Sequence, residues 1–429
     1  MDPDLATSKL VYEDIIPESV RAGPKTFEYT LAHATLQHES LFDTIIPKHA
    51  VAGTDFTAEW NTRTWPSAGP FRFEEWQTGE SITVVRNERY WGSDSVTEQS
   101  LPFLDRVTWR FIPENAARME AFVDRELDVI HPDGSRETVA ALQALQPEGA
   151  VVEVLSGSTW EHLNWQFGPG VLERNPDSCN ALYDMRLAAT QATDKQRIVD
   201  EVTSGAVSPL DGYVEVFVPG LATDAWAQYS YDPAAAAASY ARAVELAGRE
   251  CTVVFTTTAN DGNRVRVAEL LAEMFDEAGI PYRNDLEDSQ VYFGGTLDAG
   301  RWDMGQWAWT SAPAFSSLVG IHDLWDPEAP PPEGSNFYEW GTPDSFVRDE
   351  TTATFAELRD AMNATVDVEE LSILIQTAER LLADDLVFLP LHASESVAAV
   401  WADTLGGFKH NPTTGHYTWN IGEWYRIDE

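Results

Sequence analysis

Histidines and paired carboxylates are the residues that most often carry out catalysis, and neither shows a catalytic spacing in this sequence. The nine histidines are scattered. His410 and His416 share one segment, but no cysteine or acid pair accompanies them, so we expect no metal site. With 70 acidic residues, neighbouring carboxylates arise by chance and give no support for glycoside hydrolysis. Esterase, zinc-protease and phosphate-loop motifs do not occur, so the sequence predicts no catalytic residues, no cofactor and no enzyme.

Aromatic residues on irregular segments and at strand ends are the strongest candidates for ligand contact. They are Trp160, Trp165, Trp307, Trp309, Phe315, Phe337, Tyr338 and Trp340. We expect about half of them to lie in the core, as large aromatics usually do. The others are expected to line a cleft that holds a ligand between two lobes.

Charge and cysteine content narrow the possible partners and compartment. A formal charge of −42 repels phosphate backbones and anionic lipids, so we expect no nucleic-acid partner. The acids are spread along the chain, which favours a solvated coat over the alternative of a surface that attracts cationic ligands. Cys179 and Cys251 have no zinc or catalytic pattern around them. In an exported protein they could form a disulfide worth about 4 kcal/mol, and the sequence leaves this pairing open.

The stretch 67–92 predicts a β-hairpin. Apolar and polar residues alternate on both sides of a turn at 77–80 that contains glycine, which is typical of two strands with one buried face. The stretch begins with Gly69-Pro70 and ends with Tyr90-Trp91-Gly92, and a plain hairpin requires neither group.

Strands and helices alternate along the remaining chain, which predicts an α/β fold with mixed sheets and crossover helices. Further strands are expected at 25–32, 104–112, 128–130, 150–155, 158–167 and 251–258. Helices are expected at 113–127, 136–147, 184–203, 234–247, 260–278 and 367–386. The segment 206–233 has no regular period and is expected to be irregular. No stretch approaches the ~20 apolar residues of a membrane span, and the first residues do not resemble a signal peptide.

Several motifs together resemble one known family. They are Gly69-Pro70-Phe71, the Trp-x-x-Gly turn of 76–79, the Arg-Asn-x-x-Tyr-Trp-Gly end of 86–92, and the segments 45–51, 184–200, 301–315 and 381–392. This set resembles the family 5 extracellular solute-binding proteins of peptide-type ABC importers. The resemblance covers nearly the whole chain and is most specific at 45–130.

The resemblance implies a periplasmic-binding-protein-like type II fold, with two α/β lobes, mixed sheets and a hinge. Lobe I would comprise 1–160, with a reduced subdomain at 1–50, and lobe II would comprise 161–395. Residues 396–429 would return to lobe I. Tyr90 and Trp91 would cover the core of lobe I where the hairpin ends. Family members carry a further region before the segment 45–51, so we expect lobe I to be incomplete and the sequence to be a shortened form of an exported protein.

The resemblance also implies a ligand site between the lobes. The candidate ligand-binding residues are Trp160, Glu161, Asn164, Trp307, Trp309, Thr310, Ser311, Phe315, Asn336 and Tyr338. Peptide-binding relatives place an aspartate after the Trp-containing strand end, where it pairs with the peptide's ammonium group. The run 307–313 contains no acid, so either another acid, such as Glu161 or Glu339, takes that role or the ligand has no free amino terminus there.

The expected function is therefore capture of small peptides and their delivery to an ABC permease, by a monomer located in the periplasm or anchored on the cell surface as a lipoprotein. The alternative is an oligosaccharide or another small solute, which the density of tryptophans would suit. An unrecognised hydrolase and a non-functional shortened paralogue are the two remaining readings.

Overall fold

The structure is a computed structural model that describes residues 12, 14–42, 45–55, 59–60, 63–64, 66–218, 220–310, 312, 314–332, 334–413 and 417–427. Its described residues form two compact units. Unit 1 contains 41–155 and 395–429, and unit 2 contains 11–40 and 156–394. The chain passes from one unit to the other between residues 40 and 41 and again inside two long strands, β7 (Ala150–Trp165) and β11 (Phe388–Trp401).

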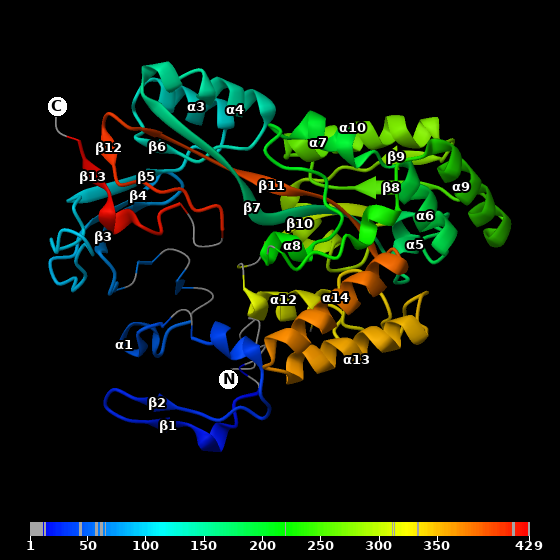
Figure 1. Cartoon of the computed structure of the whole chain (residues 1–429), viewed down its shortest axis with the longest axis horizontal. Helices are drawn as coiled ribbons and strands as arrows, with labels where there is room; N and C mark the ends of the chain where they lie inside the picture. The colour runs from blue at the N-terminus through cyan, green and yellow to red at the C-terminus, as the bar shows by residue number, and fades with distance from the viewer. Residues whose placement is uncertain are drawn as a thin grey trace. The chain divides into compact units, whose positions relative to one another are not determined.

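Unit 1 is an α/β unit (Figure 1). Besides its parts of β7 and β11, its elements are α1 (Lys48–Val51), β3 (Phe71–Gln77), β4 (Ser81–Arg86), β5 (Arg106–Arg110), α3 (Asn115–Val123), β6 (Val129–Ile130), α4 (Arg136–Gln143), η4 (Gln146–Glu148), β12 (Leu405–Gly406), η8 (Ile421–Glu423) and β13 (Tyr425–Arg426). Strands β3, β4 and β5 form an antiparallel sheet. β6 pairs with β11, and β12 pairs with β13.

The predicted hairpin is confirmed as β3 and β4. Their register pairs Trp76 with Ile82 across a turn, and Gly79 in that turn has φ of +79°, a backbone conformation that glycine adopts without strain. The expectation for the end of the hairpin was wrong, because the Trp91 side chain is 86% exposed. Its ring lies tilted by 39° against that of the half-buried Tyr90, with ring centroids 5.8 Å apart, and does not cover the core.

Helices α3 and α4 cover one hydrophobic cluster of unit 1. The cluster joins Phe122 and Leu142 from the helices to Ile130, Ala399 and Trp401 from the strands. Phe122 stacks on Trp401 with a centroid distance of 4.9 Å. A second cluster, which contains Val400, Leu405 and Trp424, surrounds the paired strands β12 and β13.

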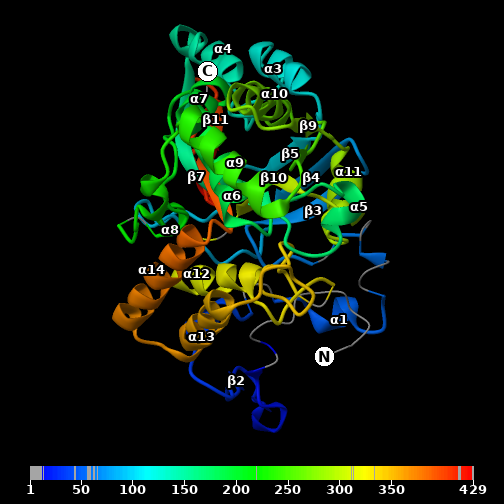
Figure 2. The same ribbon diagram turned by 90° about the vertical axis from the view of Figure 1, so that its right-hand side faces the viewer.

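Unit 2 holds most of the helices. Its elements before the second strand crossing are η2 (Pro17–Ser19), β1 (Arg21–Ala22), β2 (Phe27–Glu28), η3 (Leu36–Ser40), α5 (Val171–Arg174), α6 (Tyr183–Ala192), α7 (Lys195–Val202), α8 (Val214–Phe217), η5 (Ala225–Gln228), α9 (Pro233–Ala247), β8 (Val253–Thr256), α10 (Gly262–Glu277), β9 (Tyr282–Asn284), α11 (Ser289–Val291), η6 (Tyr292–Thr296), β10 (Met304–Thr310), α12 (Phe315–Ile321), η7 (His322–Trp325), α13 (Glu350–Ala364) and α14 (Val368–Asp384). Helices α13 and α14 lie side by side in both views (Figures 1 and 2).

The sheet of unit 2 is mixed, as the sequence predicted. Within unit 2 its strands follow the order β11-β7-β10-β8-β9. β10 is antiparallel to β7 and parallel to β8, and β8 is parallel to β9. Helix α10 connects β8 to β9 and buries Val267, Leu271 and Phe275, so it is the crossover helix that parallel neighbours require.

Several boundaries differ from the sequence prediction. Of the strand expected at 25–32 only Phe27–Glu28 is strand, and the segment 206–233, expected to be irregular, contains the short helices α8 and η5. The two strands expected at 150–155 and 158–167 are one 16-residue strand, β7. The helix expected at 184–203 is two helices, because Asp194 accepts a hydrogen bond from the Arg197 amide and caps a new helix. Such a cap replaces the missing partner of a first-turn N–H group. The next helix begins after Asp261 instead of Asn260, since the Asp261 carboxylate accepts from two amides of α10.

A disulfide and a buried carboxylate fasten the loop before α6 to the sheet. Cys179 and Cys251 are joined by a disulfide. Close by, the buried carboxylate of Asp303 accepts hydrogen bonds from the side chains of Asn175 (2.7 Å), Ser178 (2.6 Å) and Asn180 (2.8 Å) and from the Val254 amide (2.8 Å). Burial raises the pKa of Asp303 to about 6, although these donors favour the ionised form.

Candidate functional site

Strands β7 and β10 bring the two main groups of candidate residues together within unit 2. Their antiparallel register pairs Trp160 with Trp309 and Asn164 with Gly305. Thr310 pairs with Thr159, and their hydroxyl groups are 2.6 Å apart. Residues that lie about 150 positions apart in the sequence are therefore neighbours, because paired residues of adjacent strands stand on the same face.

Half of the predicted ligand-binding residues are completely buried. These residues, with exposed fractions of 0 to 1%, are Trp160, Asn164, Trp307, Asn336 and Tyr338. All three aromatic members belong to the main hydrophobic core of unit 2. In this conformation they support the surface above them and are not accessible to a solute.

The candidates that reach the surface lie at the carboxyl end of β10. Trp309 is half-buried and stacks on Phe337, with ring centroids 5.8 Å apart and an interplanar angle of 27°. The Trp309 indole donates a hydrogen bond to the Tyr338 hydroxyl at 3.3 Å. We call the stacked pair Trp309 and Phe337 the aromatic platform. A stacked pair whose indole is held by a hydrogen bond offers a preset apolar face to a ligand.

The remaining candidates surround this platform or lie outside the described residues. Thr310 is exposed, and Phe315 is half-buried at the first position of α12. The buried Asn336 side chain donates to the carbonyl oxygens of Asp326 (2.9 Å) and Trp340 (3.0 Å), and so braces the loop that carries Phe337. Ser311 and His416 lie outside the described residues.

The two acids offered as partners for a ligand's ammonium group have different surroundings. Glu161 binds Arg264 through both carboxylate oxygens, at 2.8 and 3.2 Å, and also accepts from Gln306 at 3.0 Å. Burial opposes ionisation of Glu161, but the charge and hydrogen bonds of Arg264 outweigh it and hold the pKa below its usual value. Because its charge is already neutralised, Glu161 has little left to offer an ammonium group.

Glu339 is half-buried, and among the described residues no ion pair involves its carboxylate. Burial, and then the charge of Asp344, raises its pKa. The carboxylate rests against Gly168 and Gly300, where any larger residue would collide with it. It is therefore the better placed of the two acids to meet a cation.

His162 is a buried polar residue that no sequence pattern singled out. Its Nδ1 lies 2.7 Å from the Asn164 side-chain oxygen, and burial lowers its pKa to about 3. The ring is therefore neutral at physiological pH and packs between Trp160 and Trp307. Arg264 was missed as well, because it lies 103 positions from Glu161 and only the folded sheet brings the pair together.

Among the described residues, no group of three or more His, Cys, Asp or Glu side chains is arranged to hold a metal ion. In the same part of the chain, no helix combines the length and apolar character that crossing a bilayer requires.

The architecture confirms the predicted fold class. Solved structures that superimpose on nearly the entire chain are solute-binding proteins of the two-lobed periplasmic type. Residues 1–319 match the family described as bacterial extracellular solute-binding proteins, family 5. The chain therefore belongs to this family, as the motifs of 45–130 indicated.

Individual relatives are distant in sequence, but they agree with the family assignment. The oligopeptide-binding protein OppA of Bacillus subtilis is 22% identical over 344 residues, which cover 78% of this chain and 57% of OppA. The structure of oligopeptide-binding AppA from Bacillus subtilis with a nonapeptide superimposes with a TM-score of 0.70 at 18% identity, covering 97% of this chain and 79% of AppA. AgaA from A. tumefaciens R10, bound to agropinic acid, gives a TM-score of 0.75 at 19% identity, covering 100% of this chain and 81% of AgaA. The chain thus spans little more than half the length of OppA.

Proposed function

We propose that the protein is the solute-binding component of an ABC importer that captures small peptides and hands them to a membrane permease. Membership in the family and the match to OppA support this proposal. The observation in the molecule that carries it is the aromatic platform at the carboxyl end of β10. In open α/β sheets, ligands bind beyond the carboxyl ends of the parallel strands.

We further propose that the ligand lies between two lobes. Lobe I would consist of 1–160 and 396–429, and lobe II of 161–395, with the hinge in the two strands near Trp160 and Ser394. A peptide would bind extended and pair with lobe backbone as an added strand, which gives affinity with little dependence on sequence. The side chains of the peptide would contact Trp309, Thr310 and Phe315. The rest of the site would consist of Ser311 and the five buried candidates, Trp160, Asn164, Trp307, Asn336 and Tyr338.

The surroundings and positions of the acidic residues favour a second class of ligand. Glu161 is already paired with Arg264, and the run 307–313 contains no carboxylate. A bound peptide would therefore lack the obvious partner for its ammonium group near the platform. A small solute without that group, such as an oligosaccharide, would stack on Trp309 and Phe337 without this cost. AgaA, which binds agropinic acid, shows that a similar fold accommodates a solute other than a peptide.

The location and partners follow from the same proposal. A solute-binding protein of this family would act outside the cytoplasmic membrane, as a monomer in the periplasm or as a lipoprotein. The Cys179–Cys251 disulfide fits an oxidising compartment, because disulfides persist there and are rare in the cytosol. Such a protein binds its solute without converting it, so the proposal includes no enzymatic activity.

Native mass spectrometry of the purified chain tests the proposal directly. The chain would be sprayed as isolated and again after unfolding, refolding and incubation with a mixture of di- to octapeptides or of oligosaccharides. A ladder of peptide adducts would support peptide capture, and oligosaccharide adducts alone would support the alternative. Absence of any saturable adduct, or release of cleaved products, would contradict a binding protein.

A further inference from the structure

Three polar side chains of unit 1 meet at one point. The Ser396 hydroxyl lies 2.9 Å from Nε2 of His410 and 3.3 Å from Nε2 of His131. His131 is the first residue after β6, Ser396 lies on β11, and His410 follows β12. We call these three residues the His–Ser–His cluster. Because three separate elements bring them together, no spacing in the sequence indicated the cluster.

The surroundings of His410 fix the direction of the hydrogen bonds in the cluster. Its Nδ1 is buried and has no hydrogen-bond partner among the described residues. A buried N–H group without an acceptor is rarer in folded proteins than a buried acceptor without a donor, so the ring hydrogen belongs on Nε2. Burial also lowers the pKa of His410, which keeps the ring neutral. His410 Nε2 therefore donates to Ser396, and the Ser396 hydroxyl donates to His131 Nε2.

The second of these hydrogen bonds leaves room for a ligand atom. At 3.3 Å it is longer than the ~2.8 Å that is typical of a hydroxyl donor. An atom placed beside both side chains would have to accept from Ser396 and donate to His131. A hydroxyl oxygen does both, whereas a carboxylate only accepts, an ammonium group only donates, and an amide divides the two roles between two atoms. The cluster therefore selects a hydroxyl group.

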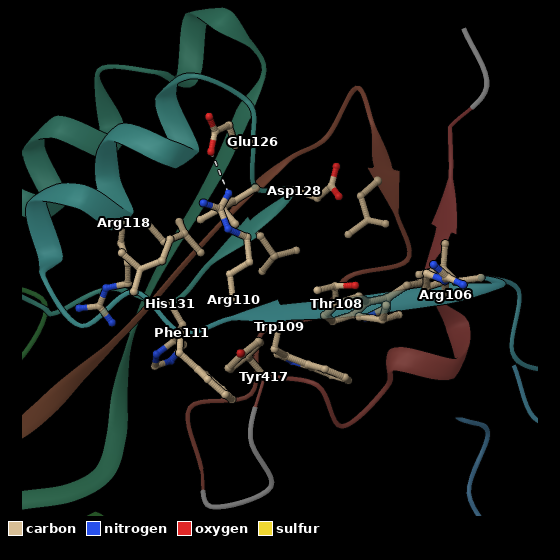
Figure 3. Close-up of a pocket in the computed structure, with 18 of the residues that line it drawn as sticks. Arg106, Thr108, Trp109, Arg110, Phe111, Arg118, Glu126, Asp128, His131 and Tyr417 are labelled. Carbon is tan, nitrogen blue, oxygen red and sulfur yellow. Dashed lines mark hydrogen bonds and ion pairs between the residues drawn. The ribbon is translucent and has the colours of Figure 1, made fainter. Parts of the chain in front are cut away.

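An aromatic face adjoins the cluster. The ring of His131 stacks on that of Tyr417, with centroids 5.1 Å apart and an interplanar angle of 19° (Figure 3). The Trp109 side chain hydrogen-bonds to the Tyr417 hydroxyl, and His131 is exposed. The aromatic platform of unit 2 has the same construction, a stacked ring pair next to a tryptophan–tyrosine hydrogen bond. A sugar ring, with apolar C–H groups on its faces and hydroxyl groups around its rim, can pack on such a face while one hydroxyl reaches the cluster.

The cluster lies at the edge of unit 1 where β11 enters it. Unit 2 ends at Ser394, so Ser396 is among the first residues of β11 that belong to unit 1. β6 is antiparallel to β11, with Ile130 opposite Ala399. The carboxyl end of β6, which leads directly into His131, therefore lies at the same edge. Ligands of α/β proteins commonly bind at the carboxyl ends of strands and at domain boundaries.

The charged side chains next to the cluster in the sequence are engaged in other bonds. Asp133 accepts from the amide and the hydroxyl of Ser135, at 3.2 and 2.7 Å. Lys409 pairs with Glu423 at 3.2 Å. An ammonium group or a carboxylate of a ligand would have to compete with these bonds, and a carboxylate would also be repelled by the net charge of −42. An uncharged ligand meets neither cost.

We propose that the His–Ser–His cluster is the contact of unit 1 with an uncharged saccharide. One hydroxyl of the saccharide bridges Ser396 and His131, and a sugar ring packs on the stacked rings of His131 and Tyr417. This inference rests on the proposed function as a solute-binding protein, and it selects the saccharide from the two ligand classes named there.

Isothermal titration calorimetry of the 429-residue chain tests the ligand class. The probes are neutral oligosaccharides of two to six units, uronic-acid oligomers of the same lengths, and di- to octapeptides. We expect saturable binding of a neutral oligosaccharide. The uronic-acid oligomers and the peptides should bind at least tenfold more weakly, because neither supplies an uncharged ring with a hydroxyl rim.

Variants of the cluster test its part in binding. Ser396→Ala and His131→Ala should each weaken binding of the neutral oligosaccharide at least fivefold. The matched control is Ser81→Ala, on strand β4 of the same unit, which should leave the affinity within twofold of the wild type. Circular dichroism establishes that each variant is folded.

The direction of the hydrogen bonds has its own test. Nitrogen-15 NMR of histidine-labelled protein should show the hydrogen of His410 on Nε2, and a hydrogen on Nδ1 would overturn the assignment. His410→Gln, whose side-chain N–H reaches the place of the Nε2–H, should lose less affinity than His410→Leu. Equal losses in these two variants would contradict a donating Nε2.

The outcomes separate this inference from the proposed function. Peptides or uronic-acid oligomers that bind best, with affinities that Ser396→Ala and His131→Ala leave unchanged, would overturn the saccharide contact and leave solute capture intact. Unchanged affinity of both variants for a neutral oligosaccharide would place that ligand elsewhere. Absence of saturable binding of every probe would contradict the proposed function and the inference together.

Discussion

Arg264 and Glu161 form a bidentate ion pair inside unit 2, with hydrogen bonds of 2.8 and 3.2 Å. Both side chains are only 13% exposed. The pair joins the first turn of α10 to the middle of β7. It removes from the candidate site the acid that the sequence offered first as a ligand partner. Its role is to satisfy two charges that the sheet and helix bury together.

Breaking this pair should strongly destabilise the fold. Arg264→Met leaves the Glu161 carboxylate buried without its cation, and we expect a loss of about 3–5 kcal/mol in the free energy of unfolding. Urea unfolding followed by circular dichroism measures it. The matched control is Arg266→Met on the same helix, whose pair with Glu201 is more than one-third exposed on the arginine side and should cost less than about 1 kcal/mol. Equal losses in the two variants would contradict the assignment.

Trp309→Ala should weaken ligand binding at least tenfold, because it removes one ring of the aromatic platform. Buried aromatic anchors typically contribute about 2 kcal/mol or more on truncation. Titration calorimetry with the solute identified by mass spectrometry measures the change. Trp91→Ala removes a tryptophan that is 86% exposed in unit 1 and should leave the affinity unchanged. Wild-type affinity in the Trp309 variant would place the ligand elsewhere.

Removing the disulfide should lower stability without changing the fold. The bond joins residues separated by 72 positions, and closing a loop of this size is worth about 4 kcal/mol in the chain-entropy model. Cys179→Ala combined with Cys251→Ala should therefore lower the free energy of unfolding by about 4 kcal/mol and move the denaturation midpoint to a lower denaturant concentration. Wild-type protein treated with a reductant should show the same shift, and the double variant should show no further change.

His322 should make the protein less stable in acid. Its Nδ1 lies 2.5 Å from the Leu318 carbonyl and its Nε2 lies 2.7 Å from the Tyr213 hydroxyl, an arrangement that fits the neutral ring. Burial lowers its pKa from 6.5 to about 4. Between these values the unfolded chain binds a proton that the folded chain does not, so stability falls as the pH falls, by about 3 kcal/mol at pH 4.

Unfolding free energies measured from pH 7 to pH 4 test this contribution. The free energy of unfolding of His322→Gln should fall less steeply with decreasing pH than that of the wild type. The difference in slope corresponds to about one proton fewer taken up on unfolding between the two pKa values. His33→Gln, which changes a side chain that is 43% exposed, should follow the wild-type curve. A wild-type slope in the His322 variant would show that the buried ring does not titrate in this way.

The sequence predicted the features that depend on neighbours in the chain. Alternation located β3 and β4, and Gly279, with φ of +67°, ends the α10 segment where glycine was expected. Helix α14 buries Leu371, Ile375 and Leu382, as their spacing indicated. Each of these depends on local periodicity or on the conformational freedom of one glycine.

What the sequence missed depends on distant partners. Apolar character did not distinguish the exposed Trp91 from the buried Trp160, because a tryptophan in or next to a strand can lie on the surface or in the core. Five of the ten candidate ligand residues lie in the core, since tryptophan and tyrosine serve packing and recognition equally well. The pairing of Glu161 with Arg264 required the register of β7 with β10 and the crossover of α10.

The carboxylate of Asp303 has a consequence for how this protein can change over evolutionary time. Its four donors come from the loop before α6 and from β8, so no other side chain can take its place alone. Asparagine would turn an amide toward groups that already donate, and the longer glutamate would place its carboxylate too far along to meet all four donors. A lineage that loses this aspartate must also rebuild the donors around it, so we expect position 303 to accept almost no single substitution in a saturation library.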